Sequence, residues 1–179
     1  MQNFKSKKKQ GGFTLMEIAI GAIIFALLAS IIAPLLNEAK DKTVMVTQEL
    51  SLMRTTIQNI GDRYSDEFVT SDLDNQELIE GNILPSAYRR NATSFEIFNM
   101  WGGQVVVAGV DNNGLTWTTE KVPSPVCTKF VDDAKSLGFE TVSVDGQDGT
   151  YSEMSNADIT QLCQTANDNV TIVFTREES

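Results

Sequence analysis

One segment of the sequence constrains the fold more than any other. The run FTLMEIAIGAIIFALLASIIAPLL, residues 13–36, is apolar apart from a single charged residue, Glu17. A helix of that length extends about 36 Å, which exceeds the ~30 Å hydrocarbon core of a bilayer. The run therefore predicts a transmembrane helix and leaves most of the 179-residue chain for a domain outside the bilayer.

Charge is distributed unevenly along the chain. Residues 1–12 carry four lysines and no acid, whereas the whole chain has 14 basic and 24 acidic side chains. Because basic flanks stay on the cytoplasmic side of a membrane, residues after Leu36 are predicted to lie outside the cytoplasm. The acidic remainder offers no basic face for phosphates, so nucleic-acid binding is not expected.

The side chains that most enzymes and metal sites use are scarce. The sequence contains no histidine and two cysteines. Histidine is the commonest general base and zinc ligand, and two cysteines alone cannot complete a structural zinc site. The stretch Asp145–Gly149 lacks EF-hand spacing, so a solvated loop is the preferred interpretation. No cofactor or metal is expected, and an enzymatic function is disfavoured.

Two simple interpretations compete for the apolar run. A signal peptide cleaved near Ala33 would have an unusually long apolar core, would contain Glu17 and would place Pro34 directly after the cut. A plain single-pass anchor explains the length of the run. It does not explain a carboxylate inside the span, where a charge costs ~2.5–3.5 kcal/mol on insertion scales.

The start of the run resembles the processing site of type IV prepilins. A basic leader ends at Gly11-Gly12, a hydrophobic residue, Phe13, follows, and Glu17 stands at the fifth position after Gly12. Pro34 occupies the twenty-second such position, where many of these pilins have a helix-kinking proline. The resemblance implies that a prepilin peptidase cleaves between Gly12 and Phe13 and that the new amine of Phe13 is methylated. Pseudopilins of type II secretion share most of this motif.

The same resemblance implies a role for Glu17 in assembly. In type IV pili this glutamate is thought to neutralise the first-residue amine of a neighbouring subunit, which fixes the axial register of the filament. After cleavage, Glu17 would lie one helical turn from the Phe13 amine and near the positive end of the helix dipole. The alternative is a pair between Glu17 and the amine of its own chain.

The apolar pattern changes after residue 36 from uniform to amphipathic. Six apolar residues follow one another at intervals of three or four, namely Val46, Leu50, Met53, Ile57, Ile60 and Tyr64. This spacing predicts that one helix of about 75 Å continues over residues 13–64, bent at Pro34. The seam is expected to pack on the chain's own head. An independent coiled coil is the alternative, although the seam covers fewer than three heptads.

Residues 65–179 are predicted to form an α+β head. Strand patterns occur at 95–98, 104–109, 115–120, 139–144 and 170–175, the second and third joined as a hairpin by the turn Asp111–Gly114. Helices are predicted near 126–137, after Ser124-Pro125, and at 156–165, with a loop at 145–150 and a loop with one short helix at 65–90. The expected fold is therefore a long N-terminal helix packed on a mostly antiparallel sheet. Trp101 and Trp117 are expected to pack in the core or in the hairpin.

The two cysteines fall on the two predicted helices of the head. In the oxidising compartment that the membrane orientation predicts, Cys127 and Cys163 are expected to form a disulfide, and two buried free thiols are the alternative. True pilins have a C-terminal disulfide loop, and a loop of this size that contains a strand resembles the type IVb group. The segment Asn99–Val105 also resembles the Asn-Pro-Phe/Trp-Gly-Gly segment of bundle-forming and conjugative pilins, with Met100 in place of proline.

The resemblance implies a structural function. Residues 1–12 would be a cleaved leader, 13–64 the long helix that forms the filament core, and 65–179 the head of the major subunit of a type IV pilus. The implied partners are further copies in a helical homopolymer, the prepilin peptidase, the inner membrane before assembly, and the pilus assembly machinery there. A minor pilin or type II pseudopilin is one alternative, and a membrane-anchored binding or sensor domain that keeps its leader is another.

We predict that the mature protein begins at Phe13 with a methylated amine, because the Gly12–Phe13 bond and Glu17 stand in the register of prepilin processing. Intact-mass measurement of protein from the native host tests this. A mature chain that begins at Met1 or after Ala33 would contradict the prediction.

Overall fold

The computed structural model describes residues 43–64, 73–110, 114–164 and 167–176. These residues belong to one compact unit, Lys42–Ser179. The predicted processing site, Glu17, Pro34 and the apolar run lie outside the described residues, as does most of the turn at 111–114. No helix within the described ranges is both long and apolar enough to cross a bilayer. The division into leader, long helix and head stays a prediction.

The described part of the N-terminal helix covers residues 43–63 and places the predicted seam against the head. Val46, Met53 and Ile60 are at most 1% exposed, and the other seam residues pack partly buried against the same core. The predicted packing of this segment on its own head is therefore confirmed. Two polar residues, Glu49 and Thr56, are buried on the same face and were not expected there.

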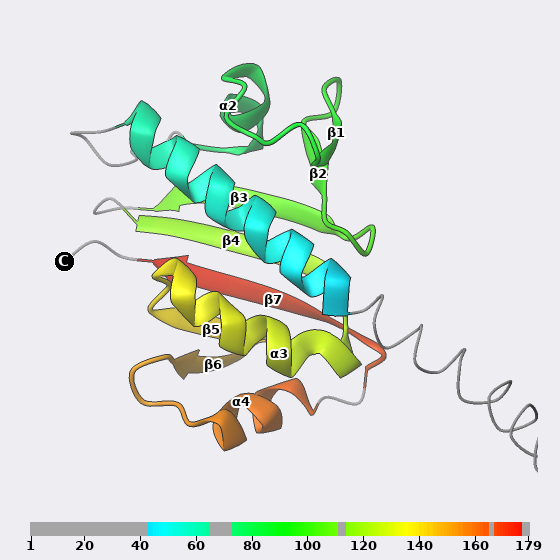
Figure 1. The fold of residues 1–179 in the computed structure, drawn as a ribbon, viewed down its shortest axis with the longest axis vertical. Helices are drawn as coiled ribbons and strands as arrows, with labels where there is room; N and C mark the ends of the chain where they lie inside the picture. The colour runs from blue at the N-terminus through cyan, green and yellow to red at the C-terminus, as the bar shows by residue number, and fades with distance from the viewer. Residues whose placement is uncertain (1–42, 65–72, 111–113, 165–166, 177–179) are drawn as a thin grey trace, which may run out of the picture. The chain divides into compact units, whose positions relative to one another are not determined.

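Seven strands form one sheet in the order β1-β2-β3-β4-β7-β5-β6, and all the described pairs are antiparallel (Figure 1). The strands are β1 (Arg89–Asn91), β2 (Glu96–Phe98), β3 (Gln104–Val110), β4 (Gly114–Pro123), β5 (Thr141–Val144), β6 (Gln147–Thr150) and β7 (Asn169–Arg176). The predicted antiparallel sheet and the β3–β4 hairpin are confirmed. The last strand, β7, lies between β4 and β5, so the sheet is complete only when this C-terminal strand has paired with both.

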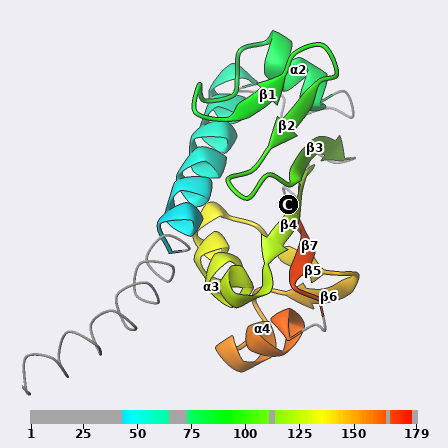
Figure 2. The same cartoon turned by 90° about the vertical axis from the view of Figure 1, so that its right-hand side faces the viewer.

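The core lies between the sheet and two helices on the same face. Figure 2 shows the N-terminal helix and α3 (Ser124–Ala134) side by side on that face. Phe130 of α3 makes edge-on ring contacts with Phe174 of β7 and with Trp101, at centroid distances of 5.6 and 5.4 Å. Trp117 is 0% exposed. The prediction that both tryptophans pack inward is confirmed.

The segment predicted as a loop at residues 145–150 is instead a tight hairpin, and that prediction was wrong. Asp145 and Gly146 have φ of 48° and 82°, as a two-residue turn requires, and Gln147–Thr150 pairs with β5 as β6. The Asp145 carboxylate accepts a hydrogen bond from the Thr171 backbone N–H at 2.8 Å. The polar sequence of β6 hides the strand because an edge strand needs few apolar side chains.

Helix ends and short elements differ from the predictions in smaller ways. Ser124 does not cap α3: Pro123 holds the cap position without a side-chain hydrogen bond, and the Ser124 hydroxyl donates to the Asn167 carbonyl. The helix ends through the 3-10 turn η1 (Lys135–Leu137), and Gly138, at φ 81°, terminates it as predicted. The short helix expected within 65–90 is α2 (Asn75–Glu80), whereas the charged strand β1 was missed.

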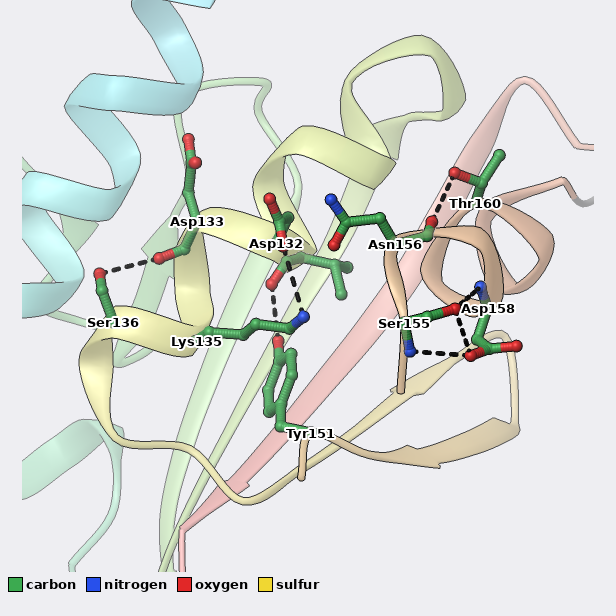
Figure 3. A network of polar contacts seen from close by, with 10 residues as sticks. Asp132, Asp133, Lys135, Ser136, Tyr151, Ser155, Asn156, Asp158 and Thr160 are labelled. Atoms are coloured by element: carbon green, nitrogen blue, oxygen red, sulfur yellow. Dashed lines mark hydrogen bonds and ion pairs between the residues drawn. The ribbon is translucent and has the colours of Figure 1, made fainter. Parts of the chain in front are cut away.

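The predicted disulfide between Cys127 and Cys163 is present and joins α3 to α4 (Asn156–Cys163). Figure 3 shows the polar contacts around this region. The Tyr151 hydroxyl donates to the Val131 carbonyl at 2.9 Å, and Ser155 caps α4 reciprocally with Asp158. Because α4 buries only Ile159 and Cys163, the disulfide is a large part of what holds it to the head.

We predict that replacing Cys127 and Cys163 together by serine lowers the free energy of unfolding by about 2–5 kcal/mol, because the bond closes a loop across a separation of 36 residues. Urea unfolding of the unit Lys42–Ser179 measures the change. A reducing agent should destabilise the unsubstituted unit and leave the double variant unaltered. Equal midpoints for the oxidised unit and the double variant would contradict the prediction.

Candidate functional site

A fully buried acidic side chain joins the described part of the N-terminal helix to the head. We call this connection the helix–head joint and define it by Glu49 on the helix, Tyr88 before β1, and the turn Asn99–Gly103 between β2 and β3. Of the residues predicted from sequence as sites, the structure brings together Cys127 and Cys163, while Gly12, Phe13, Glu17 and Pro34 lie outside the described residues.

Glu49 is the centre of the joint. Its side chain is 0% exposed, and its two carboxylate oxygens accept hydrogen bonds from the Tyr88 hydroxyl at 2.9 Å and from the Met100 backbone N–H at 3.0 Å. No ion pair formed by the described residues includes Glu49. Burial raises the pKa of the Glu49 carboxyl from 4.5 to about 7, although both hydrogen bonds act in the opposite direction. The joint therefore holds a carboxyl group that titrates near neutrality.

One side chain closes the turn on the head side of the joint. The Asn99 carboxamide oxygen accepts hydrogen bonds from the backbone N–H groups of Trp101 at 3.0 Å and Gly103 at 2.8 Å. Its amide nitrogen donates to the Thr119 hydroxyl at 2.8 Å and to the Glu120 carbonyl at 2.6 Å. The Asn99 side chain takes part in all four bonds and is 1% exposed. Asn99 therefore ties the turn to β4 and fixes the direction of the Met100 N–H.

The two glycines of the turn are required by its backbone. Gly102 has φ 80°, a left-handed conformation that side chains rarely allow. A Cβ atom at Gly103 would lie 1.8 Å from the Glu120 carbonyl oxygen, which no packing adjustment of side chains can relieve. The left-handed backbone thus explains glycine at position 102, and the close approach of the turn to β4 explains glycine at position 103.

Met100 differs from the proline of the segment that this turn resembles, and the structure gives that difference a consequence. A proline has no backbone N–H, so it could not donate the hydrogen bond that Met100 gives to Glu49. The buried carboxylate would then keep one donor, Tyr88, for two oxygens. Both oxygens of Glu49 are therefore satisfied only if position 100 is occupied by a residue other than proline.

Sequence reasoning missed Glu49 and Tyr88 as joint residues. A signal for Glu49 exists, because it lies three residues after Val46 and four before Met53 and so falls on the apolar seam. The Met100 backbone N–H that bonds to Glu49 is 51 residues away, and no sequence pattern marks that residue. As for other chemistry, the described ranges contain no group of three or more His, Cys, Asp or Glu that could hold a metal ion.

We predict that the stability of the unit Lys42–Ser179 falls as pH rises from 4.5 to about 7 through the titration of Glu49. In this interval the folded state keeps a proton that the unfolded chain releases, so the free energy of unfolding decreases with pH, by up to about 3 kcal/mol. The substitution Glu49→Gln introduces a carboxamide, which keeps an acceptor for Met100 and a donor for Tyr88 but does not titrate. It should therefore remove this decrease, as measured by urea unfolding across the interval. Parallel pH profiles for the two proteins would refute the assignment.

We also predict that Gly103→Ala lowers the free energy of unfolding by about 3 kcal/mol or more, because the added carbon meets the Glu120 backbone. Gly61→Ala is the matched control: a Cβ there meets nothing within 4 Å, and alanine should stabilise the helix by about 0.5–1 kcal/mol. Thermal unfolding of both variants tests this, and a Gly103→Ala variant as stable as the control would contradict the geometry.

Two family models match parts of this chain. A family model described as "PilS N terminal" matches residues 40–177, which is more than half of the chain. A second model, described as the prokaryotic N-terminal methylation motif, matches residues 7–33 and so spans the predicted cleavage position. The comparison with curated proteins gave no match.

Two solved structures of pilins match this chain. The crystal structure of a type IVb pilin from Salmonella typhi is 24% identical, with a TM-score of 0.57, and the match covers 74% of this chain and 99% of that chain. An NMR structure of the type IVb pilin PilS from the same organism is 24% identical over 73% of this chain and 94% of that chain, with a TM-score of 0.46. The chain therefore belongs to the PilS family and has the fold of a type IVb pilin.

Proposed function

We propose that this protein is the major structural subunit of a type IV pilus. One observation carries the proposal: the N-terminal methylation motif over residues 7–33 precedes, in the same chain, a pilin head that buries the amphipathic half of the helix. A helix that uses one half to hold its own head leaves the other half available for contacts between copies. The matched family and fold are those of a structural pilin and of no enzyme class.

Assembly follows from these parts in a physical order. The precursor is held in the inner membrane by residues 13–36, with its amino terminus cytoplasmic and its head periplasmic, and prepilin peptidase removes residues 1–12. The assembly machinery then extracts processed subunits into an extracellular helical homopolymer. Lipid and neighbouring helices are equally apolar, so packing and polar contacts between subunits decide assembly. Pairing of Glu17 with a neighbouring Phe13 amine supplies such a contact.

Features of the head support a subunit that works outside the cell. The disulfide persists in an oxidising environment and stabilises the C-terminal region without metal or partner. A minor pilin or type II secretion pseudopilin would share the amino terminus and be scarce on the surface. Abundance in fibres sheared from the native host distinguishes the major subunit from these alternatives, and a chain that keeps residues 1–12 and stays monomeric would be an anchored binding domain.

We predict that Glu17→Val gives cleaved subunits that remain in the membrane with few or no surface fibres. The change leaves the Phe13 ammonium unpaired in the fibre, which typically costs ~3–5 kcal/mol for a broken buried pair. Processing should survive because the Gly12–Phe13 bond is unchanged, and co-expression with the unsubstituted chain should give partial assembly. Sheared-fibre yield and intact mass measure both effects.

The matched control for this prediction is Asp62→Asn, which removes an exposed carboxylate from the described part of the helix. It should leave fibre yield unaltered. Normal fibre yield and length from Glu17→Val would refute pairing between subunits and favour a pair within one chain.

A further inference from the structure

The two edges of the sheet carry opposite charge. At one edge, β1 contains Arg89 and Arg90, and residues 81–95 around it contain no acid; the nearest acid on the neighbouring strand is Glu96, which pairs in register with Asn91. At the other edge, β6 lies in residues 136–175, which contain no lysine or arginine. Figure 1 shows these strands at opposite ends of the sheet, so the head has a basic end and an acidic end.

The charges at the two ends are exposed and available. Arg90 lies in a strand whose three residues are all exposed, and its side chain forms no hydrogen bond or ion pair with any residue in the described ranges. Arg89 donates one hydrogen bond to the Asn99 carbonyl at 3.3 Å. Two lysines of the head, in contrast, are neutralised locally, Lys129 by Asp133 at 2.7 Å and Lys135 by Asp132 at 3.4 Å.

The acidic end is hollowed beside β6. A depression of about 640 Å³ lies over β5, β6 and β7, and its lining includes two acidic residues, Asp148 and Glu153, and the hydroxyl-bearing residues Ser143 and Thr150. Both carboxylates are exposed, and neither forms an ion pair within the part of the chain that the structure describes. Carboxylates and hydroxyls are acceptors, and a guanidinium group carries five donors and no acceptor. The hollow is suited to an arginine side chain.

The position of the charges restricts how two copies can meet. If like edges met in a two-fold dimer, arginine would face arginine or carboxylate would face carboxylate, which is unfavourable. If unlike edges met, each head would use one surface to contact the copy before it and another to contact the copy after it. Such head-to-tail contacts generate open helical filaments wherever the rotation between copies does not close a ring.

We propose that the basic β1 edge of one chain, through Arg89 and Arg90, docks in the acidic hollow at the β6 edge of a second copy. The inference rests on the proposed function and names the surfaces through which heads meet in the fibre. A single exposed ion pair contributes little. Salt screens this contact less in the hollow than on an open surface, and the contact recurs at every subunit, so its effect on a fibre accumulates.

Charge reversal tests the proposal in the full-length protein. Arg89→Glu with Arg90→Glu places acid against acid, and Asp148→Lys with Glu153→Lys places base against base. Each double variant, expressed alone, should lower the yield of sheared surface fibres by about tenfold or more. The two variants change the net charge in opposite directions, so a common loss cannot come from net charge.

Co-expression of the two double variants gives the sharpest readout. The reversed β1 edge of one variant fits the reversed β6 edge of the other, and the unchanged edges also fit, so mixed fibres should recover to within about twofold of the unsubstituted yield. Lys121→Glu, which alters an exposed charge away from both edges, is the matched control and should leave the yield unchanged.

The outcomes separate this inference from the proposed function. If the unsubstituted chain forms no fibres, the proposed function fails. If it forms fibres and both double variants assemble normally, the edges carry solvated charge and the inference fails. It also fails if co-expression does not recover fibres although each variant accumulates with its disulfide formed and an unaltered unfolding midpoint, or if Lys121→Glu causes a comparable loss.

Discussion

Burial of one face of the N-terminal helix against the sheet is the contact around which the rest of the head is arranged. Val46, Met53 and Ile60 are removed from water along nearly the whole described length of that helix. Because the face is long and apolar, its burial makes a large hydrophobic contribution to folding and holds the helix to the head. The same contact fixes the head to the helix, as a filament subunit requires.

The helix–head joint fixes the position of the helix within this apolar contact. Apolar side chains can slide along one another at small cost, whereas the bonds from Glu49 to Tyr88 and Met100 have fixed partners and geometry. Asn99 and the two glycines hold the turn that presents the Met100 N–H. The buried carboxyl is costly to ionise, so the joint gives up some stability at neutral pH in return for a defined position of the helix on the head.

The rest of the head consists of long, well-buried central strands and of peripheral elements that bury few side chains. β4 and β7 are the long central strands, and their inward side chains alternate with outward ones, which is the signal from which both strands could be predicted. β6 and α4 bury little and depend on their neighbours, so β6 escaped prediction. β1 escaped for the same reason: a three-residue charged strand is stabilised by its partner β2 and not by its own composition.

The sequence by itself determined the features that repeat locally or allow few solutions. Helical spacing placed the seam of residues 46–64, β-branched and aromatic content with a turn placed the β3–β4 hairpin, and two cysteines in an oxidising compartment left one intramolecular pair. Tertiary structure alone decided the insertion of β7 between β4 and β5, the strand character of β6, and the environment of Glu49. Each of these depends on groups brought together from distant parts of the chain, as Glu49 and Met100 are from 51 residues apart, and no local pattern encodes which distant backbone group will satisfy a buried carboxylate.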